Sequence, residues 1–253
     1  AWFNENRGIV TACRLIEGSL AENAHRIDEL KREMQEDLDA EGIVAFPEVN
    51  VVPEFRQGLV SMAQANGIAG LQSNTVMFGW PHQEGRLEDL LRTTAEFTRL
   101  HKNTIIARPR FTGELKRRQT IDIWWRGKQQ NGDLMLLLTH LLTKNPEWSG
   151  ARVVVRSIAL DEGMRKRREE DLATLIAETR IRAESEVILK SADETVNEVI
   201  HRKSRRTDVV FFGLMEVAEG KESEAARRLE AMAEGLKTTI FVRSAGEFAG
   251  KLI

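Results

Sequence analysis

The strongest constraint on the fold is a strand, a polar turn and a helix that follow one another between residues 120 and 143. This stretch reads TIDIWWRGKQQNGDLMLLLTHLLT. Ile121, Ile123 and Trp125 lie on one face of its first part and Trp124 on the other, which predicts a strand buried on both faces, as in parallel sheets covered by helices. The leucines that follow recur at intervals of three and four residues, which is typical of an amphipathic helix. The stretch therefore predicts the first half of a βαβ unit.

The rest of the chain repeats this alternation of strand and helix. Apolar, β-branched runs predict strands at residues 8–16, 43–46, 74–79, 103–107, 121–125, 151–158, 187–189, 209–213 and 239–243. Helices are predicted at residues 20–38, 53–66, 86–101, 134–142, 162–181, 192–203 and 222–236. Ser19 is expected to cap the first helix, Pro47 to close the second strand and Pro53 to lie in the first turn of the second helix. The alternation implies parallel strands joined by right-handed helical crossovers.

An internal repeat accompanies this pattern. SNTVMFG at residues 73–79 matches TDVVFFG at 207–213, and KNTIIARP at 102–109 matches KTTIFVRS at 237–244. The two matches have nearly the same offset and a similar helix lies between each pair, so the halves look like two copies of one nucleotide-fold-like α/β module. We place the boundary in the polar, basic stretch between Phe111 and Gln119, with subdomains 1–115 and 116–253. Each is expected to hold its own mainly parallel sheet with helices on both faces.

Composition excludes several classes of protein. The chain has 253 residues, 42% of them hydrophobic and 30% charged, which is typical of a protein with a substantial core. Its formal net charge of -2 disfavours a nucleic-acid partner. No apolar run approaches the roughly 20 residues that span a bilayer, and the first residues, AWFNENRG, lack the apolar core of a signal peptide. A start without Met is compatible with a piece of a longer polypeptide. The single cysteine, Cys13, excludes an internal disulfide and fits a reducing compartment.

Two turns that follow strands are the first places to search for a phosphate site. GKQQNGD at residues 127–133 holds glycines five apart, but it lacks the Lys-Ser/Thr pair of a P-loop. Asn131 or Asp133 is expected to cap the helix behind it. GLMEVAEG at residues 213–220 lacks the triply spaced glycines and Ser/Thr of universal-stress-type ATP binders, and no GxGxxG occurs in the chain. A tight connection between strand and helix is favoured over a nucleotide site at both places.

The titratable residues show no catalytic or metal-binding pattern. No histidine has a carboxylate or a cysteine at metal-ligand spacing, and His25, His101 and His140 are expected to lie on helices. Cys13 lies in an apolar run, which favours a core position, and no serine motif resembles a nucleophile elbow. The sequence therefore predicts no catalytic residue, no cofactor-binding residue and no metal ligand.

Three basic clusters and a tryptophan pair remain. The clusters lie at residues 116–118, 165–168 and 202–206. They could contact anionic lipid or RNA, but residues 165–168 run directly into the acidic residues 169–171, which favours a solvated helix face with i,i+4 ion pairs. Trp124 and Trp125 could line a ligand pocket. Adjacent tryptophans on a central strand are more often core, which is the interpretation that we favour.

Taken together, these residues resemble the cytosolic C-terminal domain of cation-chloride cotransporters, the family of Na-K-Cl and K-Cl symporters. That family shows an Ile-Asp-x-Trp-Trp strand, a glycine-containing turn and a leucine-rich helix ending in Leu-Leu-Thr, as in residues 121–125 and 133–143. Lys144, Trp148 and ARVVVRSI at 151–158 continue the match. In the first half, IVAFPEV at 43–49 and GLQSNTVMFGW at 70–80 resemble the segment through the family's Pro-Asn-Thr-Leu strand. The long insertions and phosphorylatable segments of animal members are missing, which suggests a prokaryotic or minimal member.

The resemblance implies a fold similar to universal stress proteins, in two subdomains, and dimerisation below the membrane. The expected function is a non-enzymatic regulatory and dimerisation domain of an electroneutral cation-chloride symporter, at the cytoplasmic face of the membrane. Its partners would be a second copy and the membrane-spanning domain of the same polypeptide. Arg243, Phe248, Leu252 and Ile253 near the C-terminus lack clear periodicity, and we expect them to supply part of the dimer contact.

Two alternatives stay open. One is a nucleotide-sensing module of the same transporter, and the other is a stand-alone small-molecule-binding or hydrolytic α/β protein. About a dozen apolar spans upstream of Ala1 would favour a transporter domain, whether regulatory or nucleotide-sensing, and would exclude the stand-alone protein.

Overall fold

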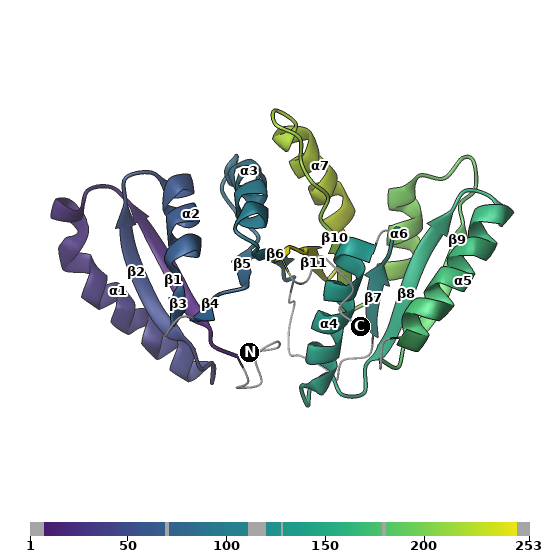
Figure 1. The fold of residues 1–253 in the computed structure, drawn as a ribbon, viewed down its shortest axis with the longest axis horizontal. Coiled ribbons are helices and arrows are strands. Elements are labelled where there is room, and N and C mark those ends of the chain that lie inside the picture. The colour runs from purple at the N-terminus through teal and green to yellow at the C-terminus, as the bar shows by residue number, and fades with distance from the viewer. Residues whose placement is uncertain (1–7, 69–70, 111–119, 128, 179–180, 247–253) are drawn as a thin grey trace. The chain divides into compact units, whose positions relative to one another are not determined.

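The computed structural model describes residues 8–68, 71–110, 120–127, 129–178 and 181–246 (Figure 1). The chain divides into two compact units, Ala1–Ser73 and Asn74–Ile253. Within the described residues, no helix is both long and apolar enough to cross a membrane.

The first unit pairs a two-stranded parallel sheet with two helices. Its elements are β1 Thr11–Glu17, α1 Leu20–Ala40, β2 Phe46–Val52, α2 Phe55–Ala65 and a hairpin of β3 Gly67–Ile68 and β4 Leu71–Gln72. Ser19 caps α1 as predicted, because its side chain accepts the Glu22 backbone N–H at 3.3 Å. Pro47, expected to end the second strand, instead lies inside β2. A proline is tolerated there when its position in the strand needs no ladder N–H.

The second unit contains a seven-stranded sheet and five helices among its described residues. Its elements are β5 Thr75–Gly79, α3 Arg86–Arg99, β6 Asn103–Arg108, β7 Thr120–Trp124, α4 Gln129–Lys144, β8 Arg152–Ala159, α5 Glu162–Glu178, β9 Glu184–Leu189, α6 Val196–Ser204, β10 Val209–Gly213, α7 Glu222–Ala233 and β11 Thr238–Arg243. The strand order is β5-β6-β11-β10-β7-β8-β9. These elements confirm the α/β class with a mainly parallel sheet.

Two features of this sheet differ from the sequence-based expectation. The strands are not all parallel, because β6 pairs antiparallel with β11. That pairing draws β5 and β6 into the same sheet as the strands of the second half, so the two halves do not each form a separate sheet. The compact units accordingly divide between Ser73 and Asn74, ahead of the predicted boundary. Residues 111–119, where we placed the boundary, lie outside the described residues.

The internal repeat appears in the structure as a local two-fold arrangement. β5, α3 and β6 form one parallel βαβ unit, and β10, α7 and β11 form the other. The antiparallel contact between the units pairs Ile106 with Phe241, which are the same position of the two repeats. Ile105 pairs with Val242 and Ala107 with Ile240, so the contact is reciprocal, as in an isologous dimer interface. The two copies of the repeat therefore meet within one chain as two subunits would.

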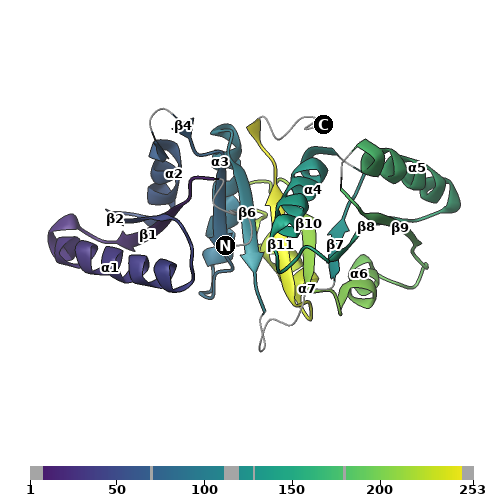
Figure 2. The ribbon, with the colours of Figure 1, turned by 90° about the horizontal axis from the view of Figure 1, so that it is seen from below.

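Helices cover both faces of the central strands. α4 packs on β7, β10 and β11, and α5 packs on β8 and β9. Figure 2 shows α4 and α5 on one side of β7 and β8 and α6 on the other. On the α6 side, α3 packs against α7, and an apolar cluster joins Trp124, Val210, Phe212 and Phe241 of the strands to these helices. Both central tryptophans are buried, with 5% of Trp124 and 6% of Trp125 exposed, which confirms the core interpretation.

Candidate functional site

The carboxyl ends of β7 and β10 form the natural ligand position of this sheet. From β7 the chain proceeds to β8 and β9 on one side, while β10 and β11 lie on the other, so the strand order reverses between β7 and β10. Open α/β sheets bind ligands in the crevice at such a reversal. Both turns singled out in the sequence lie here, because Gly127 follows β7 and Gly213 ends β10.

The Asn131 side chain lies at this position, where protein groups bind both ends of its amide. Its Nδ2 donates to the Leu214 backbone oxygen at 3.0 Å, and its Oδ1 accepts the Ser244 backbone N–H at 2.9 Å and the Ser244 hydroxyl at 3.1 Å. A Cβ added at Gly213 would lie 3.1 Å from Asn131 Nδ2. The expected capping role is wrong for both candidates, since α4 begins at Gln129 and Asn131 and Asp133 lie inside its first turns. The Asn131 amide instead joins α4 to the ends of β10 and β11.

An arginine occupies the turn between β7 and α4. Gly127 has a φ of +85°, and a Cβ there would lie 2.6 Å from Arg168 Nη1 of α5. The same nitrogen donates to the Ser157 hydroxyl at 3.1 Å, which in turn donates to the Trp125 backbone oxygen at 2.8 Å. Burial lowers the pKa of Arg168, and Asp171 offsets part of this while the Arg126 guanidinium adds to it. The turn is thus packed by protein side chains on the side facing α5.

We expect no tight ATP binding by the isolated chain at this crevice. Neither turn carries a complete phosphate-binding pattern, and the amide of Asn131 already uses the donor of Ser244 and the acceptor of Leu214. Calorimetric titration with Mg-ATP measures this directly. A micromolar or tighter dissociation constant that is lost on replacing Gly127 or Gly213 would contradict the prediction and favour the nucleotide-sensing alternative.

A buried ionic network, which sequence reasoning missed, lies on the other face of β7. Asp122 is 1% exposed and accepts hydrogen bonds from the Ser204 hydroxyl at 2.6 Å and the Thr207 hydroxyl at 2.8 Å. It also forms an ion pair with Arg156, whose Nε lies 3.1 Å from the carboxylate. Arg156 also pairs with Glu186, which pairs with Lys203. The signal was available, because a carboxylate in a strand buried on both faces requires partners. The network ties β7, β8 and β9 to the end of α6.

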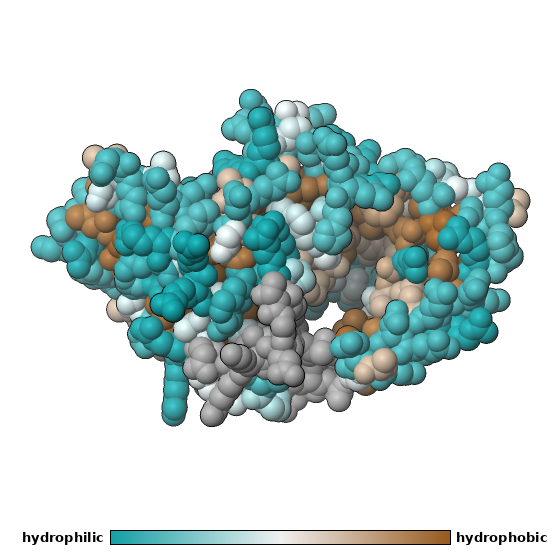
Figure 3. Space-filling model, turned by 180° about the vertical axis from the view of Figure 1, so that it is seen from behind, coloured by the Kyte–Doolittle hydropathy of each residue, from teal (hydrophilic) through white to brown (hydrophobic). Residues whose placement is uncertain are grey.

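Several members of the basic clusters pair with acids of their own surroundings. Arg165 forms ion pairs with Glu162 and Glu169 along α5, as expected for a solvated helix face. Arg202 pairs with Glu194. Most of the surface visible in Figure 3 is hydrophilic and is interrupted by separate apolar areas. The cluster at residues 116–118 lies outside the described residues.

The histidines and the cysteine occupy unremarkable positions. His25 is exposed on α1 and His140 is half-buried on α4, whereas His101 lies beyond the end of α3 with a φ of +56°, so its predicted helical position is wrong. No group of three or more His, Cys, Asp or Glu in the described ranges could hold a metal ion. Cys13 is exposed, so its predicted core position is wrong. Partial desolvation nevertheless raises the pKa of its thiol and Glu48 raises it further, which disfavours a reactive thiolate.

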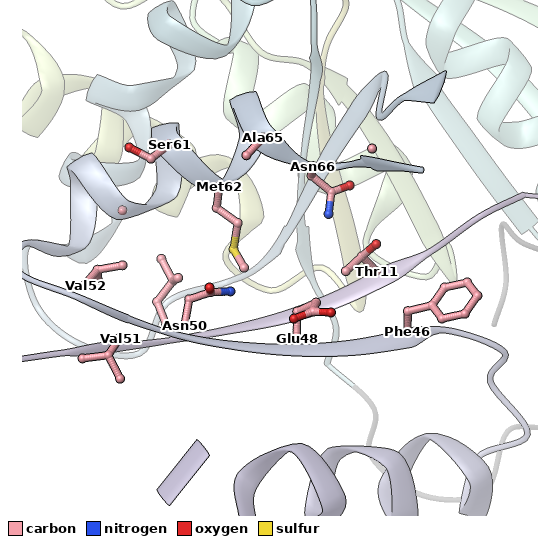
Figure 4. Close-up of a pocket in the computed structure, with 13 residues that line it drawn as sticks. Thr11, Phe46, Glu48, Asn50, Val51, Val52, Ser61, Met62, Ala65 and Asn66 are labelled. Carbon is pink, nitrogen blue, oxygen red and sulfur yellow. The ribbon is translucent and has the colours of Figure 1, made fainter. Parts of the chain in front are cut away.

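A groove of about 550 Å³ lies in the first unit between α2 and the sheet (Figure 4). Gly58 holds α2 close to β2 at one end, since a Cβ there would lie 2.7 Å from Val52. Phe46, Glu48 and Asn50 line it from β2, and Ser61 and Met62 line it from α2. Glu48 forms an ion pair with Lys31 at 3.5 Å. The lining offers no nucleophile activated by a neighbouring base.

Comparison with known proteins decides the family. A family model described as "Solute carrier family 12" matches residues 83–225, which is more than half of the chain. The chain belongs to solute carrier family 12. The matched segment begins just before α3, includes the central strand and the leucine-rich helix, and ends in α7.

Solved structures support the same fold. The chain is similar to the cytoplasmic domain of a prokaryotic cation chloride cotransporter, with a TM-score of 0.68 and 17% identity over 97% of this chain and 88% of that chain. A functionally unknown protein from Pseudomonas aeruginosa PAO1 gives a TM-score of 0.50 and 14% identity, covering 92% and 82%. A protein of Pseudomonas aeruginosa UCBPP-PA14 provisionally assigned as a universal stress protein gives 0.49 and 14%, covering 91% and 82%. With the family match, the first likeness confirms the resemblance to cation-chloride cotransporters.

Proposed function

We propose that this chain is a regulatory and dimerisation domain of an electroneutral cation-chloride symporter, held at the cytoplasmic face of the membrane and without catalytic activity of its own. It would act on a membrane-spanning domain of the same polypeptide, in which ions are bound and translocated.

The family match over residues 83–225, together with the likeness to a cotransporter's cytoplasmic domain, is the observation that carries this proposal. The site geometry supports it. The ligand position of the sheet is occupied by Asn131, and the buried charges around Asp122 are paired with one another rather than directed into a cleft. A domain built in this way is better suited to act as a rigid body that couples movements of its neighbours than to bind a substrate.

Transport by the complete protein, with and without this domain, tests the regulatory role. Chloride-dependent rubidium uptake into vesicles is expected to keep its ion selectivity when the domain is removed, while its rate changes. Loss of ion selectivity would contradict the proposal, because it would assign ion binding to this chain. An unchanged rate would contradict a regulatory role.

Self-association is expected to be weak in the free chain. Tethering under a membrane holds two copies at high local concentration, so a modest interface suffices in the complete protein. Of the expected contact residues, Arg243 is engaged within its own unit, since Nε donates to the Thr98 hydroxyl at 2.8 Å and Nη2 lies 3.3 Å from Glu216. Phe248, Leu252 and Ile253 lie outside the described residues.

Sedimentation equilibrium over a range of concentrations, repeated after deletion of residues 248–253, measures this association. We expect a concentration-dependent dimer that weakens on deletion. A strict monomer at every concentration would contradict dimerisation of the free chain. A dimer that is unchanged after the deletion would show that residues 248–253 are not part of the contact.

A further inference from the structure

Two asparagine side chains bind the backbone of residues 244 and 245, directly after β11. The Ser244 backbone N–H donates to Asn131 Oδ1 at 2.9 Å, and the next N–H, of Ala245, donates to Asn103 Oδ1 at 2.8 Å. Only 7% of Ser244 and 1% of Ala245 are exposed. Neither amide is part of the strand ladder between β11 and its neighbours, so the two side chains supply the acceptors that a buried backbone requires.

Each asparagine is also fixed at its other end. Asn131 Nδ2 donates to the Leu214 backbone oxygen at 3.0 Å, and Asn103 Nδ2 donates to the Thr75 hydroxyl at 3.1 Å. The orientation of both amides follows from these bonds, because exchanging O and N would set donors against the N–H groups of residues 244 and 245. Asn131 lies in the first turns of α4, and Asn103 begins β6. Two elements far apart in the sequence therefore bind consecutive residues.

The next residue is restrained by sterics. Gly246 has a φ of +59°, and a Cβ there would lie 2.8 Å from the His101 backbone oxygen. His101 itself has a φ of +56° in the turn that leads from α3 to β6. Only glycine meets both conditions without strain, so the chain passes closely over this turn.

We propose that Asn103 and Asn131 form a clasp, a conformational device that makes the first turns of α4, the end of β10 and residues 244–246 move as one body. When the clasp is closed, the amides of Ser244 and Ala245 are protected. When it opens, both amides and the Leu214 oxygen lose their partners together, since each asparagine bridges two elements. A displacement at the start of α4 is then transmitted to the carboxyl-terminal exit, and a displacement at the exit is transmitted to α4.

Amide hydrogen exchange in the complete chain tests the clasp. Asn131→Leu and Asn103→Leu each remove the hydrogen bonds of one asparagine while keeping a side chain of similar size. Loss of buried hydrogen bonds is expected to accelerate exchange at the amides of residues 244 and 245 by about tenfold or more in either variant. Exchange at Leu134 and Met135 of α4 is expected to rise in both as well. Asn145→Leu is the matched control, because within the described part of the chain the Asn145 side chain accepts only the nearby Glu147 N–H, at 3.0 Å.

Three results would overturn the clasp. In the first, each variant accelerates only the amide that its own asparagine binds, which means two independent bonds. In the second, exchange in the core strands β7 and β10 rises by the same factor as at residues 244 and 245, which means a general loss of stability. In the third, Asn145→Leu reproduces the effect. Asn131→Asp keeps an acceptor for the Ser244 N–H but sets an oxygen against the Leu214 oxygen. In this variant, amide exchange is expected to accelerate more in the first turns of α4 than at Ser244.

Discussion

Replacing Trp125 with alanine is expected to lower the free energy of unfolding by about 3–5 kcal/mol, the usual cost of truncating a buried large aromatic side chain. The side chain is 6% exposed, and its backbone N–H donates to the Arg156 oxygen at 2.8 Å beyond the end of β7. The indole lies against α4 at Gly132, where an added Cβ would be 2.9 Å from Nε1. Because Gly132 has no side chain, nothing at that position can fill the cavity that alanine would leave.

Chemical denaturation followed by circular dichroism measures the change. Leu160→Ala, at a position that is 62% exposed, is the control and is expected to alter stability by no more than about 0.5 kcal/mol. A loss below about 1 kcal/mol for Trp125→Ala would contradict the core assignment and reopen a surface or ligand role for this tryptophan.

Replacing Asp122 with alanine is expected to cost a comparable amount, about 3–5 kcal/mol, because removal of one member of a buried ion pair leaves the other uncompensated. Among the described residues, Arg156 would keep Glu186 as its ion-pair partner, which is itself partly exposed, and two buried hydroxyls would lose their acceptor. Trp124 adds to the loss, since its indole N–H donates at 3.0 Å to the same Ser204 hydroxyl that binds Asp122.

Asp122→Asn separates charge from hydrogen bonding. Asparagine keeps an oxygen for the hydroxyls of Ser204 and Thr207 but removes the negative charge, so we expect a smaller loss than with alanine. A double-mutant cycle of Asp122→Ala with Ser204→Ala is expected to give a coupling energy of about 0.5–3 kcal/mol. Equal losses for alanine and asparagine at this position, or no coupling with Ser204, would show that the hydroxyl contacts contribute nothing.

The sequence alone determined the class of the fold and most of its elements. Alternating apolar residues and leucines at helical spacing report local geometry, and these signals predicted β7, α4 and the repeated βαβ units, although α4 begins at Gln129, ahead of its predicted start. The repeat was also visible in the sequence, because its two copies have similar apolar strand residues in the same order. The family resemblance followed from the order of these motifs.

Only the tertiary structure decided how the copies meet and what fills the ligand position. Antiparallel pairing of β6 with β11 joins strands 135 positions apart in the repeat, and no local pattern specifies which edge of a strand finds a partner. Asn131 looked like a helix cap because capping is a local rule, yet its amide binds residues 83 and 113 positions away. A carboxylate at position 122, inside a buried strand, indicates that partners are required. Which residues they are, here Arg156, Ser204 and Thr207, depends on which elements the fold places beside β7. Side-chain contacts over such separations are fixed by the packing of the whole chain, so no short stretch of sequence predicts them.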